Sequence, residues 1–272
     1  MTGILNFVIP ILHPENAKNW HVVKKNLEET MRSISGQISD NWRATIVANK
    51  ESDLPELRPK FQINYVDFPP NPIFEKGSQN IETFRDAVRL DKGRRLLSGM
   101  LHVRKYSTDD DYIMTVDGDD LISCNLASFV RQNSGANGWY IPTGFFWEDG
   151  GKLLYKSSIF SRRCGTSHIV KIGLLSLPNS FDAAQDDYVK NMLGSHIFIK
   201  DFMEKQKTPL DPLSFPGAVY RINHSESHSK SSGLLGKVFL QNGVLKSPKK
   251  VISETLKFRL VNTSFKKEFW GV

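Results

Sequence analysis

Cysteine is scarce in this chain of 272 residues, which has only Cys124 and Cys164. Two cysteines cannot build a disulfide framework, and no Cys-x-x-Cys pair is present that could bind zinc. No stretch approaches the roughly 20 consecutive apolar residues that a membrane-spanning helix needs. The first ten residues, through Pro10, lack the basic and long apolar parts of a signal peptide. These absences predict a protein of the reducing cytoplasm, soluble or held at the inner face of a membrane.

Motifs for binding nucleic acid are also absent, although the net charge is +7. Between Ser231 and Val272 the chain has eight Lys or Arg and two Glu, so nearly all of the excess charge lies in this tail. No helix-turn-helix, zinc finger or aromatic RNA-binding pattern accompanies the charge, which argues against a nucleic-acid partner. Apolar residues are interleaved with the basic ones. The tail therefore fits either helices that pack on the main domain with a solvated basic face, or a peripheral contact with anionic lipid.

Strand and helix signals alternate along the first half of the chain. Buried strands are expected at four apolar runs, 5–11, 43–48, 62–68 and 112–116. Apolar residues at helical spacing predict a helix over 23–34 and a second helix that starts near Asp91. This alternation predicts an α/β domain over residues 1–230, with a mostly parallel sheet flanked by helices. Residues 231–272 are expected to form a basic, helical C-terminal extension.

The second half of the chain is more mixed. Its apolar runs predict three further strands, at 139–147, 153–160 and 218–222. Apolar residues at helical spacing predict a helix within 181–202.

An acidic motif, Asp117-Gly118-Asp119-Asp120, directly follows the strand expected at 112–116. In open parallel sheets, ligands bind just beyond the carboxyl ends of the strands. Three carboxylates this close repel one another unless a cation lies between them, and oxygen ligands favour Mg²⁺ or Mn²⁺. Gly118 permits the tight turn that brings Asp117 and Asp119 together. The alternative is an acidic turn that caps a helix starting near Asn125.

The run Tyr-Ile-Met-Thr-Val-Asp-Gly-Asp-Asp resembles the strand and Asp-x-Asp motif of GT-A glycosyltransferases near family 2. The similarity covers roughly residues 4–229 and includes the strand ending in Pro10, Asp91-Lys92-Gly93 and Cys164-Gly165-Thr166-Ser167. It implies a GT-A (Rossmann-like) fold. It also implies an inverting enzyme that moves a sugar from a nucleotide-sugar donor, in the first place a UDP-sugar, to a hydroxyl of a glycan or lipid-linked acceptor. A Mn²⁺ or Mg²⁺ ion would bridge the Asp-x-Asp carboxylates and the donor diphosphate.

The resemblance also implies a metal site and its ligands. Asp119 would be the principal ligand, Asp117 would reach the metal or the ribose, and Asp120 would orient them. A His from the segment 223–229 would complete the site, with His224 as the first choice and His228 as the alternative. An exposed polar loop is the competing interpretation of that segment.

Contacts to the nucleotide would come from the strand ends and from the helix expected near Asp91. The residues implied are Pro10, His13, Asn49, Asp91, Lys92 and Asp117. Asn49 replaces the Asp that is usual at this point in family 2 relatives, although an amide can still pair with the edge of a uracil. Asp91 could instead be a simple helix N-cap.

Two acids are candidates for the catalytic base that deprotonates the acceptor hydroxyl. Asp187 matches the second member of a Glu-Asp pair in the relatives, and Asp186 is the second choice. Both could equally be acids that the dipole favours at a helix N-terminus. Gly165, Thr166 and Ser167 would form the wall beside the donor sugar, since glycine permits close backbone approach.

Two other functions are compatible with a similar sheet. A sugar-phosphate nucleotidyltransferase should carry a glycine-rich phosphate loop with an Arg soon after the first strand. Residues 11–16, which follow that strand here, contain neither Gly nor Arg. A non-catalytic nucleotide-sugar-binding protein of the same fold is the third hypothesis. The intact acidic motif, the later His residues and the later Asp pair argue against it.

Overall fold

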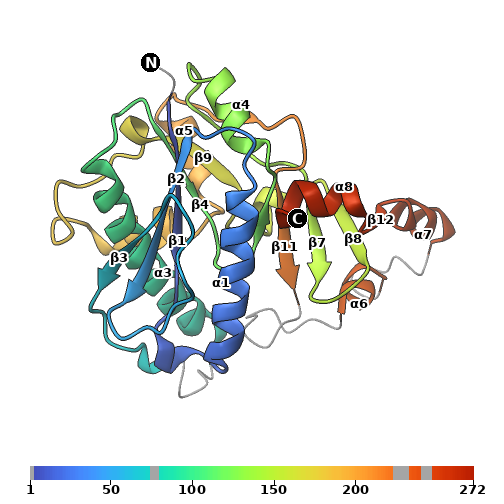
Figure 1. Cartoon of the computed structure of the whole chain (residues 1–272), viewed down its shortest axis with the longest axis horizontal. Helices are drawn as coiled ribbons and strands as arrows, with labels where there is room; N and C mark the ends of the chain where they lie inside the picture. Colours follow the sequence, from blue (N-terminus) through green and yellow to red (C-terminus); the bar gives the residue numbers. More distant parts are fainter. Residues whose placement is uncertain (1–2, 74–79, 223–232, 240–246) are drawn as a thin grey trace.

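A seven-stranded sheet forms the centre of the molecule in a computed structural model that describes residues 3–73, 80–222, 233–239 and 247–272 (Figure 1). Its strands, in spatial order, are β10 (Asp211–Pro212), β6 (Gly138–Tyr140), β9 (His168–Lys171), β4 (Tyr112–Thr115), β1 (Leu5–Pro10), β2 (Trp42–Asn49) and β3 (Phe61–Val66). β1 pairs in parallel with β2 and β4, and β2 pairs in parallel with β3. Only β9 runs antiparallel to its neighbours, β4 and β6. The predicted α/β class with a mostly parallel sheet is confirmed.

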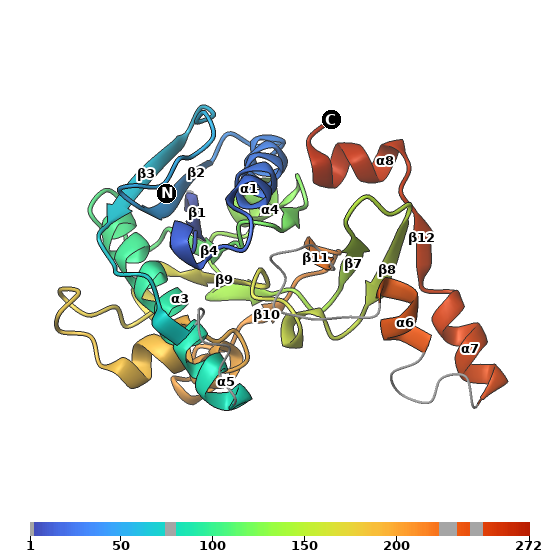
Figure 2. The same ribbon diagram turned by 90° about the horizontal axis from the view of Figure 1, so that it is seen from below.

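Helices cover both faces of this sheet (Figure 2). One face carries α1 (Trp20–Ser35) and α4 (Leu126–Gln132), and the other carries α3 (Ile81–Arg104), the π-helix η4 (Tyr188–Leu193) and α5 (Ile199–Lys205). Because side chains alternate along a strand, Phe7 and Ile9 of β1 join the core beneath α1, whereas Val8 joins the core beneath α3. The predicted apolar face of α1 is buried, including Leu27 and Met31.

The helix expected to start near Asp91 begins earlier, at Ile81. The side chain of Asn80 accepts a hydrogen bond from the Glu82 amide and caps the helix, and Glu82 pairs with Arg85 one turn on. No Gly or Pro interrupts residues 81–90. Five of these ten residues are apolar, but none of residues 82–90 is fully buried, so a clear buried face marks only the part of the helix that covers the sheet. Asp91 therefore lies inside α3, and the N-cap interpretation is wrong.

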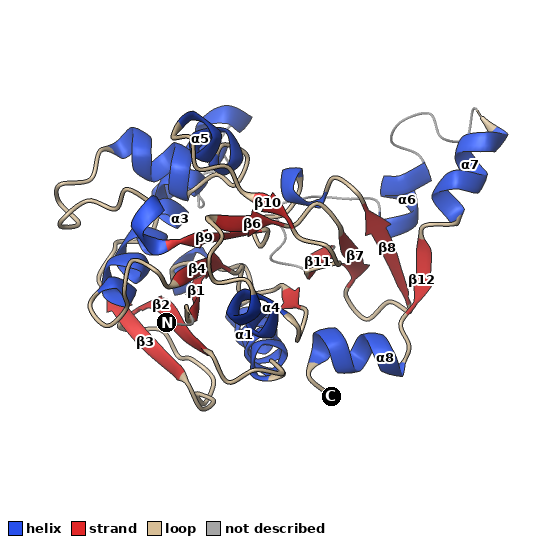
Figure 3. Cartoon of the chain, turned by 90° about the horizontal axis from the view of Figure 1, so that it is seen from above, coloured by secondary structure: helices blue, strands red, loops and turns tan. Residues whose placement is uncertain are grey.

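A smaller sheet stands beside the main one (Figure 3). Its five strands, in order, are β12 (Phe258–Leu260), β8 (Leu153–Ser157), β7 (Gly144–Glu148), β11 (Ala218–Ile222) and β5 (Leu121–Ile122). The single strand expected at 139–147 is thus wrong, because β6 belongs to the main sheet and β7 to the small one. Pro142 lies between them and has no N–H for a ladder hydrogen bond. The strand expected at 153–160 ends at Ser157, and Phe160 starts a short 3-10 helix.

The helix expected within 181–202 is also wrong as one element, since it divides into η4 and α5. Gly194 ends η4, and a Cβ there would lie 1.9 Å from the carbonyl oxygen of Arg89 in α3. Glycine at this position thus allows the two backbones to touch, at the cost of helical continuity.

The C-terminal residues supply both helices and a strand. The helices are α6 (Gly233–Phe239), α7 (Pro248–Thr255), α8 (Thr263–Phe265) and the π-helix η6 (Lys266–Trp270). The remaining short helices of the described chain are η1 (Pro14–Asn16), η2 (Phe160–Arg162) and η3 (Ile172–Leu174). β12 extends the small sheet, and Phe269 is buried against Phe145 and Leu154 of that sheet. In the described part of the chain, no helix combines the length and apolar character needed to cross a membrane.

Candidate functional site

The acidic motif forms the turn by which the chain leaves the main sheet and enters the small one. β4 ends at Thr115 and β5 begins at Leu121, and the Asp120 amide donates to the carbonyl oxygen of Asp117 at 3.0 Å. The Asp117 amide in turn donates to Thr166 Oγ1 at 2.9 Å. The turn therefore stands at the carboxyl end of β4, where the sequence predicts a ligand site, and it does not directly precede α4.

Asp117 forms an ion pair with Lys92 of α3. Burial, the largest single effect, lowers the pKa of the Lys92 ammonium, but the charge and hydrogen bond of Asp117, with smaller effects of Cys164 and Asp120, together outweigh it, so the net pKa lies above its ordinary value. A Cβ at residue 165 would lie 2.8 Å from both Asp117 Oδ2 and Lys92 Nζ. Glycine lets the backbone approach this pair closely, and a side chain at residue 165 would displace the ends of Asp117 and Lys92. Three residues from distant parts of the sequence thus meet at one point.

Asp120 is fully buried, in contrast to the half-buried Asp117 and Asp119. Its Oδ2 accepts hydrogen bonds from Thr166 Oγ1 at 2.6 Å and Cys164 Sγ at 3.2 Å, and its Oδ1 accepts from the Arg221 amide at 3.2 Å. Burial, with the charges of Asp119 and Asp117, raises the pKa of Asp120 well above its ordinary value. Its contacts are those of a group that fixes the turn rather than one that meets a ligand.

The segment 164–168 lies against the acidic turn, with Gly165 beside the Asp117–Lys92 pair and Thr166 bonded to the turn. Thr166 and Ser167 are completely buried, and Ser167 Oγ donates to the carbonyl oxygen of Cys164 at 2.7 Å. The ring of His168 lies 3.1 Å from the same hydroxyl. Of the three residues expected beside the donor sugar, only Gly165 is partly exposed. Thr166 and Ser167 support the backbone of this segment from its buried side.

Asn49 and Asp91 belong to one buried network around Arg95, a residue outside the predicted site, whose charge would by default be expected in solvent. Arg95 is 1% exposed and donates to both carboxylate oxygens of Asp91, at 3.0 and 3.3 Å, and to Asn49 Oδ1 at 2.7 Å. Asn49 Nδ2 donates to the carbonyl oxygen of Phe68 at 2.7 Å. The charge of Arg95 also lies over the Phe68 ring. This network joins the carboxyl end of β2 to α3, one turn of helix from Lys92.

His13 and Pro10 mark the carboxyl end of β1. His13 is 3% exposed; its Nδ1 accepts a hydrogen bond from the Glu15 amide at 3.1 Å, and its Nε2 lies 2.7 Å from Glu51 Oε1. Both ring nitrogens are therefore engaged within the protein. Pro10 is half-buried beside Val47 of β2.

The Asp pair lies before η4, which packs along α3. Both side chains are exposed, and Asp186 Oδ1 lies 3.8 Å from Arg94 of α3. Asp187 is the N-cap residue of η4 but makes no side-chain cap hydrogen bond. The two expected metal ligands His224 and His228 lie outside the described residues.

His196 is a further polar group near the Asp117–Lys92 pair, and no sequence motif includes it. Its Nε2 is buried and has no hydrogen-bond partner in the described part of the molecule. Burial and the charge of Lys92 lower the pKa of His196, against an opposing effect from Asp117 and a hydrogen bond to the backbone of Arg162. A buried nitrogen without a partner is unusual, and a bound ligand would satisfy it.

Arg221 is completely buried beside the turn, with its side chain between β11 and α1. Its guanidinium contacts Asn26 at 2.8 Å, Asp149 at 3.2 Å and Glu29 at 2.5 Å. The same group lies over the ring of Trp147. Two carboxylates therefore neutralise the buried cation. The backbone amide of Arg221 donates a hydrogen bond to Asp120.

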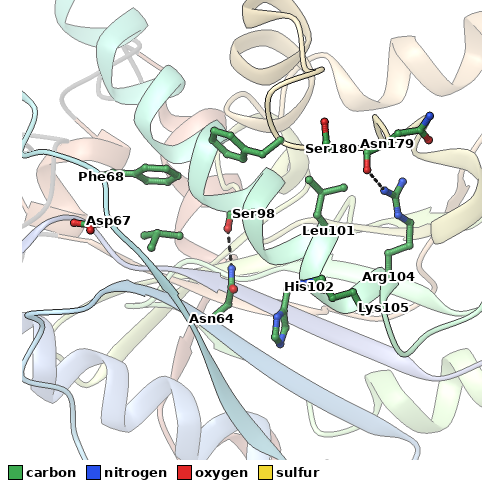
Figure 4. A pocket seen from close by; sticks show the side chains of 12 residues that line it. Asn64, Asp67, Phe68, Ser98, Leu101, His102, Arg104, Lys105, Asn179 and Ser180 are labelled. Atoms are coloured by element: carbon green, nitrogen blue, oxygen red, sulfur yellow. Dashed lines mark hydrogen bonds between the residues drawn. The ribbon is translucent and has the colours of Figure 1, made fainter.

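A separate cavity of about 490 Å³ lies between α3, β3 and residues 179–181 (Figure 4). Asn64 donates to Ser98 at 2.8 Å across it, and the Phe68 and Phe181 rings stack with centroids 5.5 Å apart. Phe68 is shared with the Arg95 network. The residues that line this cavity do not include any from the acidic turn or the 164–168 segment.

A divalent ion at the turn would have few protein ligands among the described residues. No group of three or more His, Cys, Asp and Glu side chains comes together in them in a way that could hold a metal. Asp117 and Asp119 remain as two neighbouring carboxylates. This set suits Mg²⁺ or Mn²⁺, which are commonly held by one or two carboxylates together with substrate phosphates.

No protein-family model matches the chain, and no curated protein matches it. Its fold is similar to that of a manganese complex from Mycobacterium tuberculosis (TM-score 0.39, 9% identity, 80% of this chain and 91% of that one). It is also similar to a protein described as a putative nucleotide-diphospho-sugar transferase, from Desulfovibrio desulfuricans (TM-score 0.39, 12% identity, 93% of this chain and 95% of that one). A third similar structure is 4-diphosphocytidyl-2C-methyl-D-erythritol synthase from Anaerococcus prevotii (TM-score 0.37, 10% identity, 90% of this chain and 97% of that one). Likeness at this level concerns the fold alone, so the activity is argued from the site.

Proposed function

We propose that this chain is a metal-dependent glycosyltransferase of the GT-A type. It would transfer a sugar from a nucleotide-sugar donor, for which a UDP-sugar is our first choice, to a glycan or lipid-linked acceptor. The observation that carries the proposal is the meeting of Asp117, Lys92 and Gly165 at the carboxyl end of β4, with Asp119 two residues on. A diphosphate needs cations and close backbone approach, and this point offers both.

Asp119 and Asp117 would hold a Mn²⁺ or Mg²⁺ ion, with His224 or His228 as a further ligand. The bound ion would act as a Lewis acid that neutralises the departing nucleoside diphosphate. Lys92 already hydrogen-bonds Asp117, and an ammonium has three N–H groups, so it can donate to phosphate oxygens as well. Asp120 keeps the turn in place through its three hydrogen bonds.

Nucleotide recognition would use the carboxyl ends of β1 and β2, where Pro10 is half-buried. His13 and Asn49, which are buried and already bonded within the protein, would hold these strand ends in place. Asp91 would act through Arg95, to which both it and Asn49 are bound. Gly165 would face the donor sugar, and Thr166 and Ser167 would support it from the buried side.

Asp187 is our candidate for the base that accepts the proton of the acceptor hydroxyl, and Asp186 is the second choice. Asp187 is exposed and makes no cap hydrogen bond, which suits a base that must meet an incoming acceptor. Asp186 already interacts weakly with Arg94.

Nucleotide binding is the first test of the proposal. Thermal unfolding should be measured with UDP, GDP and CMP, each with and without Mn²⁺. A nucleotide at a hundred times its Kd should add about 2.7 kcal/mol of stability. Asp119→Ala should abolish the metal-dependent part of this stabilisation, whereas Asp182→Ala, at an exposed Asp outside the turn, should leave it unchanged. If no nucleotide stabilises the protein in the presence of metal, the proposal fails.

The catalytic base is tested by Asp187→Asn. This variant should still bind nucleotide and metal but should lose transfer, whereas Asp182→Asn should retain both. Full transfer by Asp187→Asn would exclude Asp187 as the base, and the same comparison on Asp186→Asn would then decide the second choice.

A sugar-phosphate nucleotidyltransferase is the second candidate, because an ammonium beside an acidic turn would also suit a leaving pyrophosphate. The two reactions differ in what they release. A glycosyltransferase releases a nucleoside diphosphate from a nucleotide sugar, whereas a nucleotidyltransferase releases pyrophosphate from a nucleoside triphosphate. Assays for both products on the same preparation distinguish them.

A further inference from the structure

The helix α7 presents apolar side chains to solvent. None of its residues is buried, and Ile252 and the following Leu256 are 62% and 68% exposed. They are four residues apart and therefore lie on one face of the helix. The opposite side, with Val251 and Glu254, is the less exposed one. Two large aliphatic side chains therefore lie in water, whereas an amphipathic helix usually turns such side chains inward.

The strand that follows α7 continues the same character. β12 is at the edge of the small sheet, and its Leu260 is 67% exposed. Single exposed apolar residues are ordinary, but residues 252–260 expose three large ones within nine positions, which is more apolar surface than a solvated segment usually presents. α7 and β12 lie at one end of the molecule in the views of Figures 2 and 3.

Basic residues are interspersed with these three along the chain. Residues 247–260 contain four Lys or Arg and a single acid, Glu254. That acid is engaged with Lys257 at 2.7 Å and with the hydroxyl of Tyr155. Lys249, Lys250 and Arg259 are exposed. The six exposed residues, which we call the α7–β12 tip, are Lys249, Lys250, Ile252, Leu256, Arg259 and Leu260.

We propose that the α7–β12 tip is a docking surface for an anionic lipid bilayer. Large aliphatic side chains can enter the boundary between headgroups and acyl chains, while Lys and Arg beside them attract anionic headgroups. A second copy of the chain is a poor match for the tip, because two tips facing each other would oppose their positive charges. The proposal does not depend on the transfer reaction, since no residue of the tip belongs to the acidic turn.

Vesicle sedimentation of the full chain, without nucleotide, tests the proposal. The protein should sediment with phosphatidylcholine vesicles that contain phosphatidylglycerol and remain in solution with phosphatidylcholine alone. Removing both apolar side chains in Ile252→Ser/Leu256→Ser should lower the partition coefficient at least about tenfold. The matched control, Ile38→Ser/Leu57→Ser, removes one Ile and one Leu that are exposed elsewhere and should bind like the wild type.

The charge contribution is tested separately. Lys249→Glu/Lys250→Glu/Arg259→Glu should lower the partition coefficient about a hundredfold, at about fivefold for each basic residue near an anionic surface. The control Lys50→Glu/Lys205→Glu/Arg131→Glu makes the same change of net charge at exposed positions away from the tip. Circular dichroism establishes that each variant is folded. Equal binding to both kinds of vesicle, absence of binding, or unchanged binding by either tip variant would overturn the proposal.

Discussion

Acidification from about pH 8 to about pH 5 should cost the native state about 2 kcal/mol through one buried side chain, His168. His168 is 4% exposed and lies on β9 beneath α3. Burial, with a smaller effect of His196, lowers the pKa of His168 from 6.5 to about 3. The native state therefore keeps this ring neutral while the unfolded chain takes up a proton. Its contribution is complete above about pH 6.5 and is lost progressively as the pH falls toward about 3.

The magnitude depends little on the native pKa. At about pH 5 the unfolded ring is about 1.5 pH units below its own pKa, and each unit corresponds to 1.36 kcal/mol. Any native pKa below about 4 gives nearly the same loss, about 2 kcal/mol, because the native ring is then still largely neutral. Other titrating groups also change the stability, so the quantity to measure is a difference between two proteins.

The assay is urea unfolding of the wild type and of His168→Gln at both pH values. Glutamine retains a polar side chain beside Ser167 but does not titrate. The variant should be less sensitive to acid than the wild type by about 2 kcal/mol, whatever its stability at the higher pH. If both proteins lose the same free energy of unfolding, within about 0.5 kcal/mol, the reasoning is refuted.

Three further substitutions should affect stability, each measured by urea unfolding. Thr166→Val removes the hydroxyl that donates to Asp120 at 2.6 Å and should cost about 1–3 kcal/mol, whereas Thr166→Ser should retain most of the stability; equal losses in both would contradict the assigned hydrogen bond. Gly194→Ala puts a Cβ 1.9 Å from a backbone oxygen and should cost about 1–3 kcal/mol, whereas Gly135→Ala, with nothing within 4 Å, should cost far less. Arg221→Met leaves two carboxylates beside a buried site without their cation and should cost about 3–5 kcal/mol; a neutral outcome would show that water reaches them.

The strands and α1 could be predicted because burial on one or both faces leaves a regular apolar pattern in the sequence. The same reasoning failed for α3 at its start, where the helix extends beyond the sheet and none of residues 82–90 is fully buried. It failed again at 139–147, where one apolar run supplies strands to two different sheets. An apolar pattern reports that a segment is buried, but it does not report which partner buries it.

The acidic turn could be located from the sequence because it follows a strand directly. Lys92 and Gly165, which lie beside it, belong to two of the segments on which the resemblance rests. The buried charges could not be located in this way. Arg95 binds a partner 46 residues away, and Arg221 binds one 192 residues away. Their burial is compensated by partners that only the fold brings together. His196 could not be located from the sequence either, since nothing in its neighbouring residues marks it.

The position of the acidic turn between the two sheets has a mechanical consequence. β4 belongs to one sheet and β5 to the other, and the turn's buried carboxyl is also bound to the Arg221 amide of β11. A ligand held by this turn would restrain the small sheet against the large one. Slower amide hydrogen exchange in β5 and β11 would then report occupancy of the site from strands that the ligand never touches.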